Sequence, residues 1–189
     1  MEANQQHITN LVERCKKSDK NAQLQLYKAY YKAMYNSAIR ILKDSYEAED
    51  IMQEAFLTAF TKIDSFKGEV TFGTWLKRIV INKSLTQLKK INRYDEVKLE
   101  VVSSKEEDDD VALNYQGINP KSVLNYLQSL KENYRLVLTL NLIEGYDYEE
   151  IGLILNYTNE NVRTTVSRAK KKLKQVILAN SINTQAYGR

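Results

Sequence analysis

The sequence predicts an all-α protein with two small helical domains joined by a flexible acidic linker. Turn formers are scarce, with six Gly and one Pro in 189 residues, which favours long helices over a turn-rich β-sandwich or barrel. Apolar residues recur at the spacing of a helix face in two separate blocks. Between the blocks this periodicity fades in a charge-rich segment. We therefore expect a domain at 1–94, a linker at 95–120, a helix-turn-helix domain at 121–180 and a tail at 181–189.

Three long helices are expected in the first block. The first covers Ala22 to Leu42, which carries an apolar and aromatic face. The second opens at Asp44, which with Glu47 forms a capping pair. Its buried stripe is expected to be Ala48, Ile51, Met52, Ala55, Phe56, Ala59 and Ile63. The third is expected to use Thr74 as its cap and to continue to about Ile91.

The second block predicts shorter helices separated by recognisable caps. Two apolar faces come first, made by Val123, Leu124, Leu127 and Leu130 and then by Tyr134, Val137, Leu138 and Leu142. Gly145 is expected to end the second of these helices in a left-handed conformation. Asp147 with Glu150 opens a short helix, Asn156 supplies a left-handed turn, and Thr158 caps the last helix. The inward stripe of that helix is Val162, Val166, Ala169, Leu173 and Ile177.

The last two predicted helices form a helix-turn-helix, in which a turn of about three residues joins a short helix to a longer one. The outward side chains of the longer helix can hydrogen-bond base edges or phosphates if it enters a major groove. The following sequence RAKKKLK adds phosphate attraction that is independent of base sequence. The competing interpretation is a solvated helix end whose cations complement the helix dipole. The outward residues are Arg163, Thr164, Ser167, Arg168 and Lys171.

A second group mixes aromatic and basic residues between Thr61 and Arg93. Phe66, Phe72 and Trp75 lie among many cations, a combination that suits single-stranded nucleic acid because bases stack on rings while cations hold the backbone. Aromatic residues at helical spacing are also common core residues, so a structural role stays open. The cations are Lys62, Lys67, Lys77, Arg78, Lys83, Lys89, Lys90 and Arg93.

A third group lies on the second helix, opposite its buried stripe. Asp50, Gln53, Glu54 and Leu57 share this face, which combines acids with an exposed leucine. Paired carboxylates can serve acid–base or metal chemistry, but no histidine accompanies them. A protein-docking patch is the simpler interpretation, and plain solvent exposure is the remaining one.

Charge and composition exclude several classes of protein. Residues 1–94 hold 16 Lys and Arg against 10 Asp and Glu, residues 95–120 hold 2 against 8, and residues 121–189 hold 10 against 6. Two basic blocks suit a polyanionic partner. Cys15 and His7, the chain's single cysteine and histidine, cannot form an intramolecular disulfide or the usual four-ligand zinc site. We expect Cys15 to be half-buried and His7 to face solvent rather than to form a nucleophile–base pair.

The sequence also predicts where the protein acts. No window approaches the run of about 18 apolar residues that a membrane helix needs. The N-terminus lacks the basic-then-apolar pattern of a signal peptide. We therefore expect a soluble, cytoplasmic protein that does not insert into membranes.

Taken in order, the three groups resemble the extracytoplasmic-function (ECF) group of RNA polymerase sigma factors in the sigma-70 family. The resemblance is carried by EAEDIMQEAFLTAF, by SFKGEVTFGTWLKRIVINKSL and, after the acidic segment, by YRLVLTLNLIEGYDYEEIGLILNYTNENVRTTVSRAKKKL. It covers the chain from about Leu24 to Val176. Two matching domains in the same order are far more specific than a lone helix-turn-helix. Asn156 stands where the family usually has glycine in the turn.

The resemblance implies a transcription initiation factor with no catalytic activity, metal or cofactor of its own. It implies binding to core RNA polymerase at the clamp helices of the largest subunit through Asp50, Gln53, Glu54 and Leu57. The polymerase flap is a second implied contact. It implies recognition and melting of the -10 promoter element, as duplex and non-template strand, through Phe66, Lys67, Trp75, Lys77, Arg78, Asn82 and Lys83. It implies duplex recognition of the -35 element through Thr158, Asn161, Arg163, Thr164, Ser167, Arg168 and Lys171.

Two further implications concern partners. The acidic linker resembles the family segment that passes through the polymerase interior toward the RNA exit channel. The group is commonly controlled by a membrane-linked anti-sigma factor, so such a partner is a further hypothesis.

Two alternatives come from other readings of the same residues. The first is a dimeric helix-turn-helix regulator that binds a palindromic duplex without polymerase, which leaves the face of Asp50 and the acidic linker unexplained. The second is a small helical hydrolase that uses Asp50 and Glu54 with a divalent metal, which leaves the nucleic-acid features unexplained.

Overall fold

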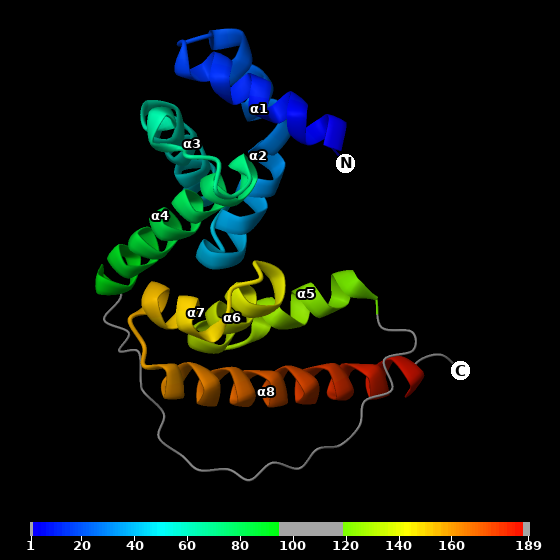
Figure 1. The fold of residues 1–189 in the computed structure, drawn as a ribbon. Coiled ribbons are helices and arrows are strands. Elements are labelled where there is room, and N and C mark those ends of the chain that lie inside the picture. Colours follow the sequence, from blue (N-terminus) through cyan, green and yellow to red (C-terminus); the bar gives the residue numbers. More distant parts are fainter. Residues whose placement is uncertain (1, 95–118, 187–189) are drawn as a thin grey trace. The chain divides into compact units, whose positions relative to one another are not determined.

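The computed structural model describes residues 2–94 and 119–186 and confirms the all-α fold (Figure 1). The chain divides into two compact units, Met1–Val97 and Lys98–Arg189, which we call unit 1 and unit 2. Within the described ranges, helices and their connecting turns account for the whole structure, without a strand. The acidic linker expected at 95–120 falls outside the described residues except for its last two positions. No described helix is both long enough and apolar enough to cross a membrane.

Unit 1 is a bundle in which three long helices pack against one another and a shorter one packs across them. Helices α2, α3 and α4 make the main contacts, and α1 contacts α2, α4 and the short 3-10 turn η1. The elements are α1 (Glu2–Lys16), α2 (Lys20–Leu42), α3 (Ser45–Thr61), η1 (Ile63–Ser65) and α4 (Phe72–Tyr94).

The helix starts of unit 1 follow from side-chain caps. The Asp19 carboxylate accepts hydrogen bonds from the N–H groups of Asn21 and Ala22, which opens α2. The bond from Ala22 and the nearby Arg14 guanidinium hold the pKa of Asp19 below its usual value. Asp44 caps α3 through the N–H groups of residues 46 and 47, which confirms the predicted start.

Thr74, which was predicted to cap α4, does not cap it, so this prediction is wrong. The helix begins at Phe72, and the Thr71 hydroxyl oxygen accepts a hydrogen bond from the Thr74 N–H at 3.2 Å. Thr74 therefore lies inside the first turn, where its N–H needs an acceptor, and Thr71 supplies that acceptor. The helix also continues past Ile91 to Tyr94.

The core of unit 1 matches the predicted stripe. All seven residues expected to line the buried face of α3 and its end are buried. Cys15 is fully buried rather than half-buried, and burial raises the pKa of its thiol to about 11. His7 is exposed, as expected. The Cys15 thiol is therefore a structural group that stays protonated at neutral pH.

Unit 2 is built on one long helix. In Figure 1, α8 runs the length of the unit, and α5, α6 and α7 lie on one side of it. The elements are α5 (Pro120–Ser129), α6 (Glu132–Leu138), the π-helical turn η2 (Thr139–Ile143), α7 (Tyr148–Leu155) and α8 (Asn159–Ala186). Helix α8 thus continues beyond residue 180, where we expected the tail to begin.

The predicted caps of unit 2 are confirmed. Asp147 and Glu150 form a reciprocal capping box, with bonds of 2.8 and 3.1 Å to each other's N–H groups. Asn156 has a φ of 58° and Gly145 a φ of 80°, so both adopt the left-handed conformation. The Thr158 hydroxyl oxygen accepts from the Asn161 N–H at 3.2 Å, at the start of α8.

Two leucines of unit 2 that were predicted to lie in the core are exposed. Leu124 is 39% exposed and Leu142 is 53% exposed. Leu142 lies in the π-helical turn η2, which holds an extra residue per turn and so rotates the following side chains off the face that a regular helix predicts. In contrast, the five residues expected on the inward stripe of α8 are all buried.

Candidate nucleic-acid and protein interfaces

The acidic residues predicted on one face lie together on α3 and are exposed. Asp50, Gln53 and Glu54 face solvent, and Leu57 is 68% exposed beside them. The Gln53 side-chain amide donates to the Glu49 carboxylate at 3.3 Å, which extends the polar face by one residue. We call Asp50, Gln53, Glu54 and Leu57 the acidic face.

In the described part of the chain, metal-ligating side chains do not gather at the acidic face. Among the described residues, no three His, Cys, Asp or Glu side chains lie close enough together to hold a metal ion. A polar rim around an exposed apolar side chain is the composition of a protein-docking patch.

The acidic face is linked to α4 by an ion pair that sequence analysis missed. The Lys83 ammonium lies 3.1 Å from the Glu54 carboxylate. Lys83 was predicted as a DNA-binding residue and Glu54 as a polymerase-binding residue, so the pair joins the two predicted sites. Both side chains are partly exposed, and such a pair contributes about 1 kcal/mol or less to stability.

The predicted aromatic residues form one cluster at the start of α4. The ring centre of Phe66 lies 5.3 Å from that of Trp75 and 5.9 Å from that of Phe72. Phe72 also packs edge-on against Tyr30 of α2 at 5.5 Å. Phe72 is 1% exposed and belongs to the core, whereas Phe66 and Trp75 are half-buried and keep part of their rings accessible.

The predicted cations lie around this cluster and along α4. Lys67 and Arg78 are exposed, Lys77 and Lys83 are half-exposed, and Asn82 is exposed. Half-buried rings bordered by cations are the arrangement that stacks bases and holds their phosphates. The aromatic and basic residues predicted to bind single-stranded nucleic acid therefore lie close together. Phe72 lies among them but belongs to the core.

A cavity of about 240 Å³ adjoins the cluster, and α1 forms one of its walls. Phe66, Lys67 and Gly68 line it from the loop before α4, and Thr9 and Glu13 line it from α1. The sequence pattern does not reveal the α1 residues, because only the packing of α1 against the bundle brings them there. A cavity of this size and mixed polarity can accommodate one base.

The helix-turn-helix presents its polar face on α8. Asn161, Arg163, Thr164 and Ser167 are exposed, and so is the capping residue Thr158. Arg168 and Lys171, also predicted, are half-buried. All seven lie off the buried stripe, which leaves them accessible to a ligand.

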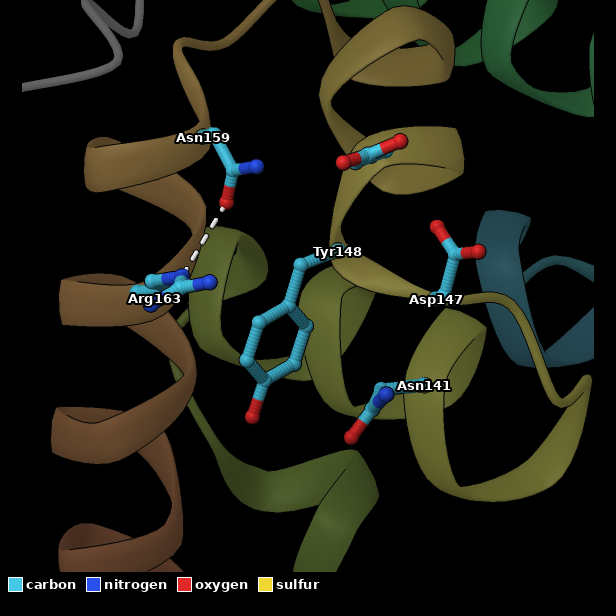
Figure 2. A pocket seen from close by; sticks show the side chains of 6 residues that line it. Asn141, Asp147, Tyr148, Asn159 and Arg163 are labelled. Atoms are coloured by element: carbon cyan, nitrogen blue, oxygen red, sulfur yellow. Dashed lines mark hydrogen bonds between the residues drawn. The ribbon is translucent and has the colours of Figure 1, made fainter.

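A polar hollow of about 500 Å³ lies beside the start of α8 (Figure 2). Tyr148 and Arg163 both line it, and the Arg163 Nε atom donates to the Asn159 side-chain oxygen at 3.2 Å. This bond holds the guanidinium against the first turn of α8 and limits its conformations. The sequence pattern did not single out Tyr148 and Asn159, although both adjoin predicted caps.

The turn between α7 and α8 is tight enough to require glycine at one position. A Cβ atom on Gly152 would lie 2.9 Å from the Tyr157 carbonyl oxygen. Gly152, which lies within α7, therefore permits the close approach of the turn at Tyr157 to this helix.

Comparison with known proteins places both units in one family. Residues 26–94 match Sigma-70 region 2, and residues 121–173 match Sigma-70, region 4. The chain is 31% identical over 173 residues to the ECF RNA polymerase sigma-E factor of Escherichia coli (strain K12), covering 86% of this chain and 90% of that protein. It is 29% identical over 184 residues to the ECF RNA polymerase sigma factor SigW of Bacillus subtilis (strain 168), covering 89% and 95%.

Solved structures show the same fold. The sigma factor RpoE of Bartonella quintana, solved with the anti-sigma factor NepR, matches with a TM-score of 0.54 and 24% identity, covering 81% of this chain and 94% of that one. CnrH, solved with the cytosolic domain of CnrY, matches with a TM-score of 0.53 and 21% identity, covering 89% and 96%.

Proposed function

Since this chain belongs to the ECF group of the sigma-70 family and is a promoter-recognising RNA polymerase sigma factor, we propose how its residues divide that work. Unit 1, with the domain at 1–94, docks on the polymerase and opens the -10 element. Unit 2, with the domain at 121–180, reads the -35 element as duplex. The observation that carries this division is the order of the two matched regions, each of which falls on one unit.

The acidic face of α3 is the proposed docking surface for the clamp helices of the largest polymerase subunit. Asp50 and Glu54 supply charges that complement basic residues on a partner and steer its approach. Leu57 supplies apolar area that is removed from water when the partner docks. Asp50 and Glu54 thus act in binding, and the protein has no catalytic role of its own.

Phe66 and Trp75 are the proposed stacking surfaces for unpaired bases of the non-template strand. Removing a base from a duplex costs a few kcal/mol, and stacking on an aromatic ring returns about 1–3 kcal/mol per base. The cavity between α1 and the loop before α4 is the proposed site for one such base. Lys67, Lys77, Arg78 and Lys83, with Asn82, hold the strand.

The exposed face of α8 is the proposed reader of the -35 element. Arg163 is the strongest candidate for a base contact, because arginine bonds guanine through two hydrogen bonds. Thr158, Asn161, Thr164 and Ser167 surround it, and Arg168 and Lys171 lie one and two turns further on, where phosphates follow the groove.

Regulation by an anti-sigma factor, and action in the cytoplasm, are part of the same proposal. The fold neighbours were solved with the anti-sigma factor NepR and with the cytosolic domain of CnrY. Affinity capture with the tagged full chain and the proteins encoded beside it tests this point: failure of every neighbour to bind would remove it.

Run-off transcription tests the proposed function. Core polymerase lacking sigma factors, from the same organism, is incubated with genomic fragments with and without the protein. We expect discrete transcripts that vanish with the double change Asp50→Lys, Glu54→Lys. If no transcript appears while the protein alone shifts duplex DNA, the dimeric regulator is the better account.

A further inference from the structure

A tyrosine-lined groove lies between α2 and α3, outside the acidic face. Its volume is about 580 Å³. Tyr27, Tyr31 and Tyr35 line it from α2, and Tyr46 and Glu49 line it from the first turns of α3. Tyr46 is 82% exposed, so its ring is accessible to a partner. We call this set the tyrosine groove.

Aromatic contacts hold one wall of the tyrosine groove. The rings of Tyr27 and Tyr31 stack with their centres 5.6 Å apart and an angle of 13° between their planes. Tyr27 is anchored in turn on Phe56, at 4.8 Å between ring centres. Met52, which is buried, lies beneath. Such fixed rings lose little conformational freedom when a partner binds, which is the reason tyrosines dominate many interfaces.

The chemistry of the groove fits a cation. The Lys32 ammonium lies 5.9 Å from the centre of the Tyr31 ring, within the range of a cation–π contact, which shows that a cation can reach this ring. Lys32 is exposed, and an arginine of a partner would displace its ammonium group from the ring. The exposed Glu49 carboxylate adds a negative charge at the same groove. An arginine suits both features, because its planar guanidinium stacks on a ring and bonds a carboxylate at once.

The groove is also continuous with the acidic face. Glu49 lines the groove, and its carboxylate accepts the hydrogen bond from Gln53, a member of that face. A partner seated on Asp50 and Gln53 therefore reaches the rings without leaving α3. A nucleic acid is the poorer occupant, since its phosphates would meet the carboxylates of Glu49 and Asp50.

We propose that the tyrosine groove binds an arginine side chain of the same polymerase surface that docks on the acidic face. The inference rests on the proposed function, and it adds Tyr31, Tyr46 and Glu49 to the polymerase contacts. The docking surface then includes both the acidic face and the tyrosine groove. Its charged residues are joined by aromatic side chains that can anchor the partner.

Titration of fluorescently labelled full-length protein with core polymerase tests the proposal. Tyr31→Leu removes the ring and should weaken binding about 2- to 30-fold, the range expected for one cation–π contact. Tyr31→Phe keeps the ring and should bind within about two-fold of the wild type on the same grounds. Glu49→Gln, at an exposed position, removes the negative charge of the groove and should also weaken binding. Tyr126→Leu in α5 of unit 2 is the control, with no expected change.

The possible outcomes distinguish failure of the tyrosine groove proposal from failure of the proposed docking on the acidic face. If Tyr31→Leu and Glu49→Gln bind as the wild type while Asp50→Lys, Glu54→Lys does not, the groove is not a contact and the acidic face remains one. If the charge reversal also binds normally, the docking surface itself is wrong. Equal loss in Tyr31→Phe and Tyr31→Leu overturns arginine stacking in favour of the hydroxyl group.

A photo-crosslinking residue in place of Tyr46 supplies the second measurement. Crosslinks to a peptide of the largest subunit that contains arginine support the proposal. Crosslinks only to promoter DNA, or only to a second copy of the chain, overturn it.

Discussion

Unit 1 and unit 2 place their candidate residues in opposite ways relative to their cores. In unit 1 the site and the core share residues: Phe66, Phe72 and Trp75 form one cluster, yet Phe72 is buried and the other two are half-exposed. In unit 2 the buried stripe and the exposed face of α8 are separate sets. The candidate residues of unit 1 come from α3, the loop before α4 and α4, with α1 as a wall of the cavity, whereas most of those of unit 2 lie on α8.

This difference predicts how the two units respond to mutation. A change in unit 1 should alter stability and binding together, since the same cluster serves both. A change on the outer face of α8 should alter binding alone. Each prediction below tests one side of this contrast.

The largest effect is expected at Phe72. Phe72→Ala leaves a cavity beneath Tyr30 and Trp75 and should destabilise unit 1 by about 3–5 kcal/mol. Alkylation of Cys15 reports the opening of unit 1, because the thiol is buried and its pKa of about 11 keeps it protonated at pH 8. Phe66→Ala is the matched control, with a smaller rise in labelling rate. Equal labelling of Phe72→Ala and wild type would contradict the assignment of Phe72 to the core.

Two glycines give the next comparison. Gly152→Ala forces a Cβ against the Tyr157 carbonyl and should destabilise unit 2 by about 1–3 kcal/mol, despite the better helix propensity of alanine. Gly73→Ala places a Cβ 2.7 Å from the edge of the Tyr30 ring, a half-buried side chain that can shift more easily than backbone. Trp75, the single tryptophan, reports unit 1 by fluorescence, and circular dichroism reports both units. Gly152→Ala should shift the dichroism transition and leave the fluorescence transition in place. A larger loss of stability in Gly73→Ala than in Gly152→Ala would contradict this expectation.

On α8, substitution of a base-contacting residue and of a phosphate-contacting residue should have different effects on DNA binding. Arg163→Ala should lower the preference for the -35 element by about 1–3 kcal/mol without changing stability. Lys171→Ala should weaken binding to all sequences alike and reduce the slope of log affinity against log salt by about 1. Fluorescence anisotropy of the polymerase complex with matched and scrambled elements measures both. Loss of stability in Arg163→Ala would show that the outer face of α8 also supports the fold.

The smallest effect is expected for Glu54 and Lys83. A double-mutant cycle with Glu54→Gln and Lys83→Met should give a coupling of about 1 kcal/mol or less in the unfolding of unit 1, decreasing as salt is added. Trp75 fluorescence in urea measures it. A coupling that persists at high salt would contradict the treatment of this ion pair as a solvent-screened surface contact.

The sequence predicted caps and buried stripes within single helices more closely than contacts between helices, and the physical reason is the reach of each interaction. Caps such as Asp147 with Glu150 act over three residues, and the stripe of α8 follows one helix, so periodicity reveals both. The Glu54–Lys83 pair joins residues 29 apart, and the cavity beside Phe66 takes a wall from α1. Such features depend on how helices pack, which periodicity within a helix does not encode.

Local patterns also fail where the backbone departs from the regular helix. Leu142 was expected inside but lies in the π-helical turn η2, where the face rotates. Thr71 and Thr74 both suit a cap, and spacing alone does not distinguish them. The missed positions are therefore turns and helix contacts, while the fold class and the exposed faces followed from composition and spacing.

The most direct test of the account is permanganate probing of promoter DNA, which modifies unpaired thymines. The account predicts reactive thymines between the -10 element and the start site only when core polymerase and the full chain are both present. It also predicts that Phe66→Ala and Trp75→Ala reduce this reactivity while the -35 element stays protected. The opposite result, protection of a palindromic duplex by the chain alone with no reactive thymine, would contradict the division of work between the two units.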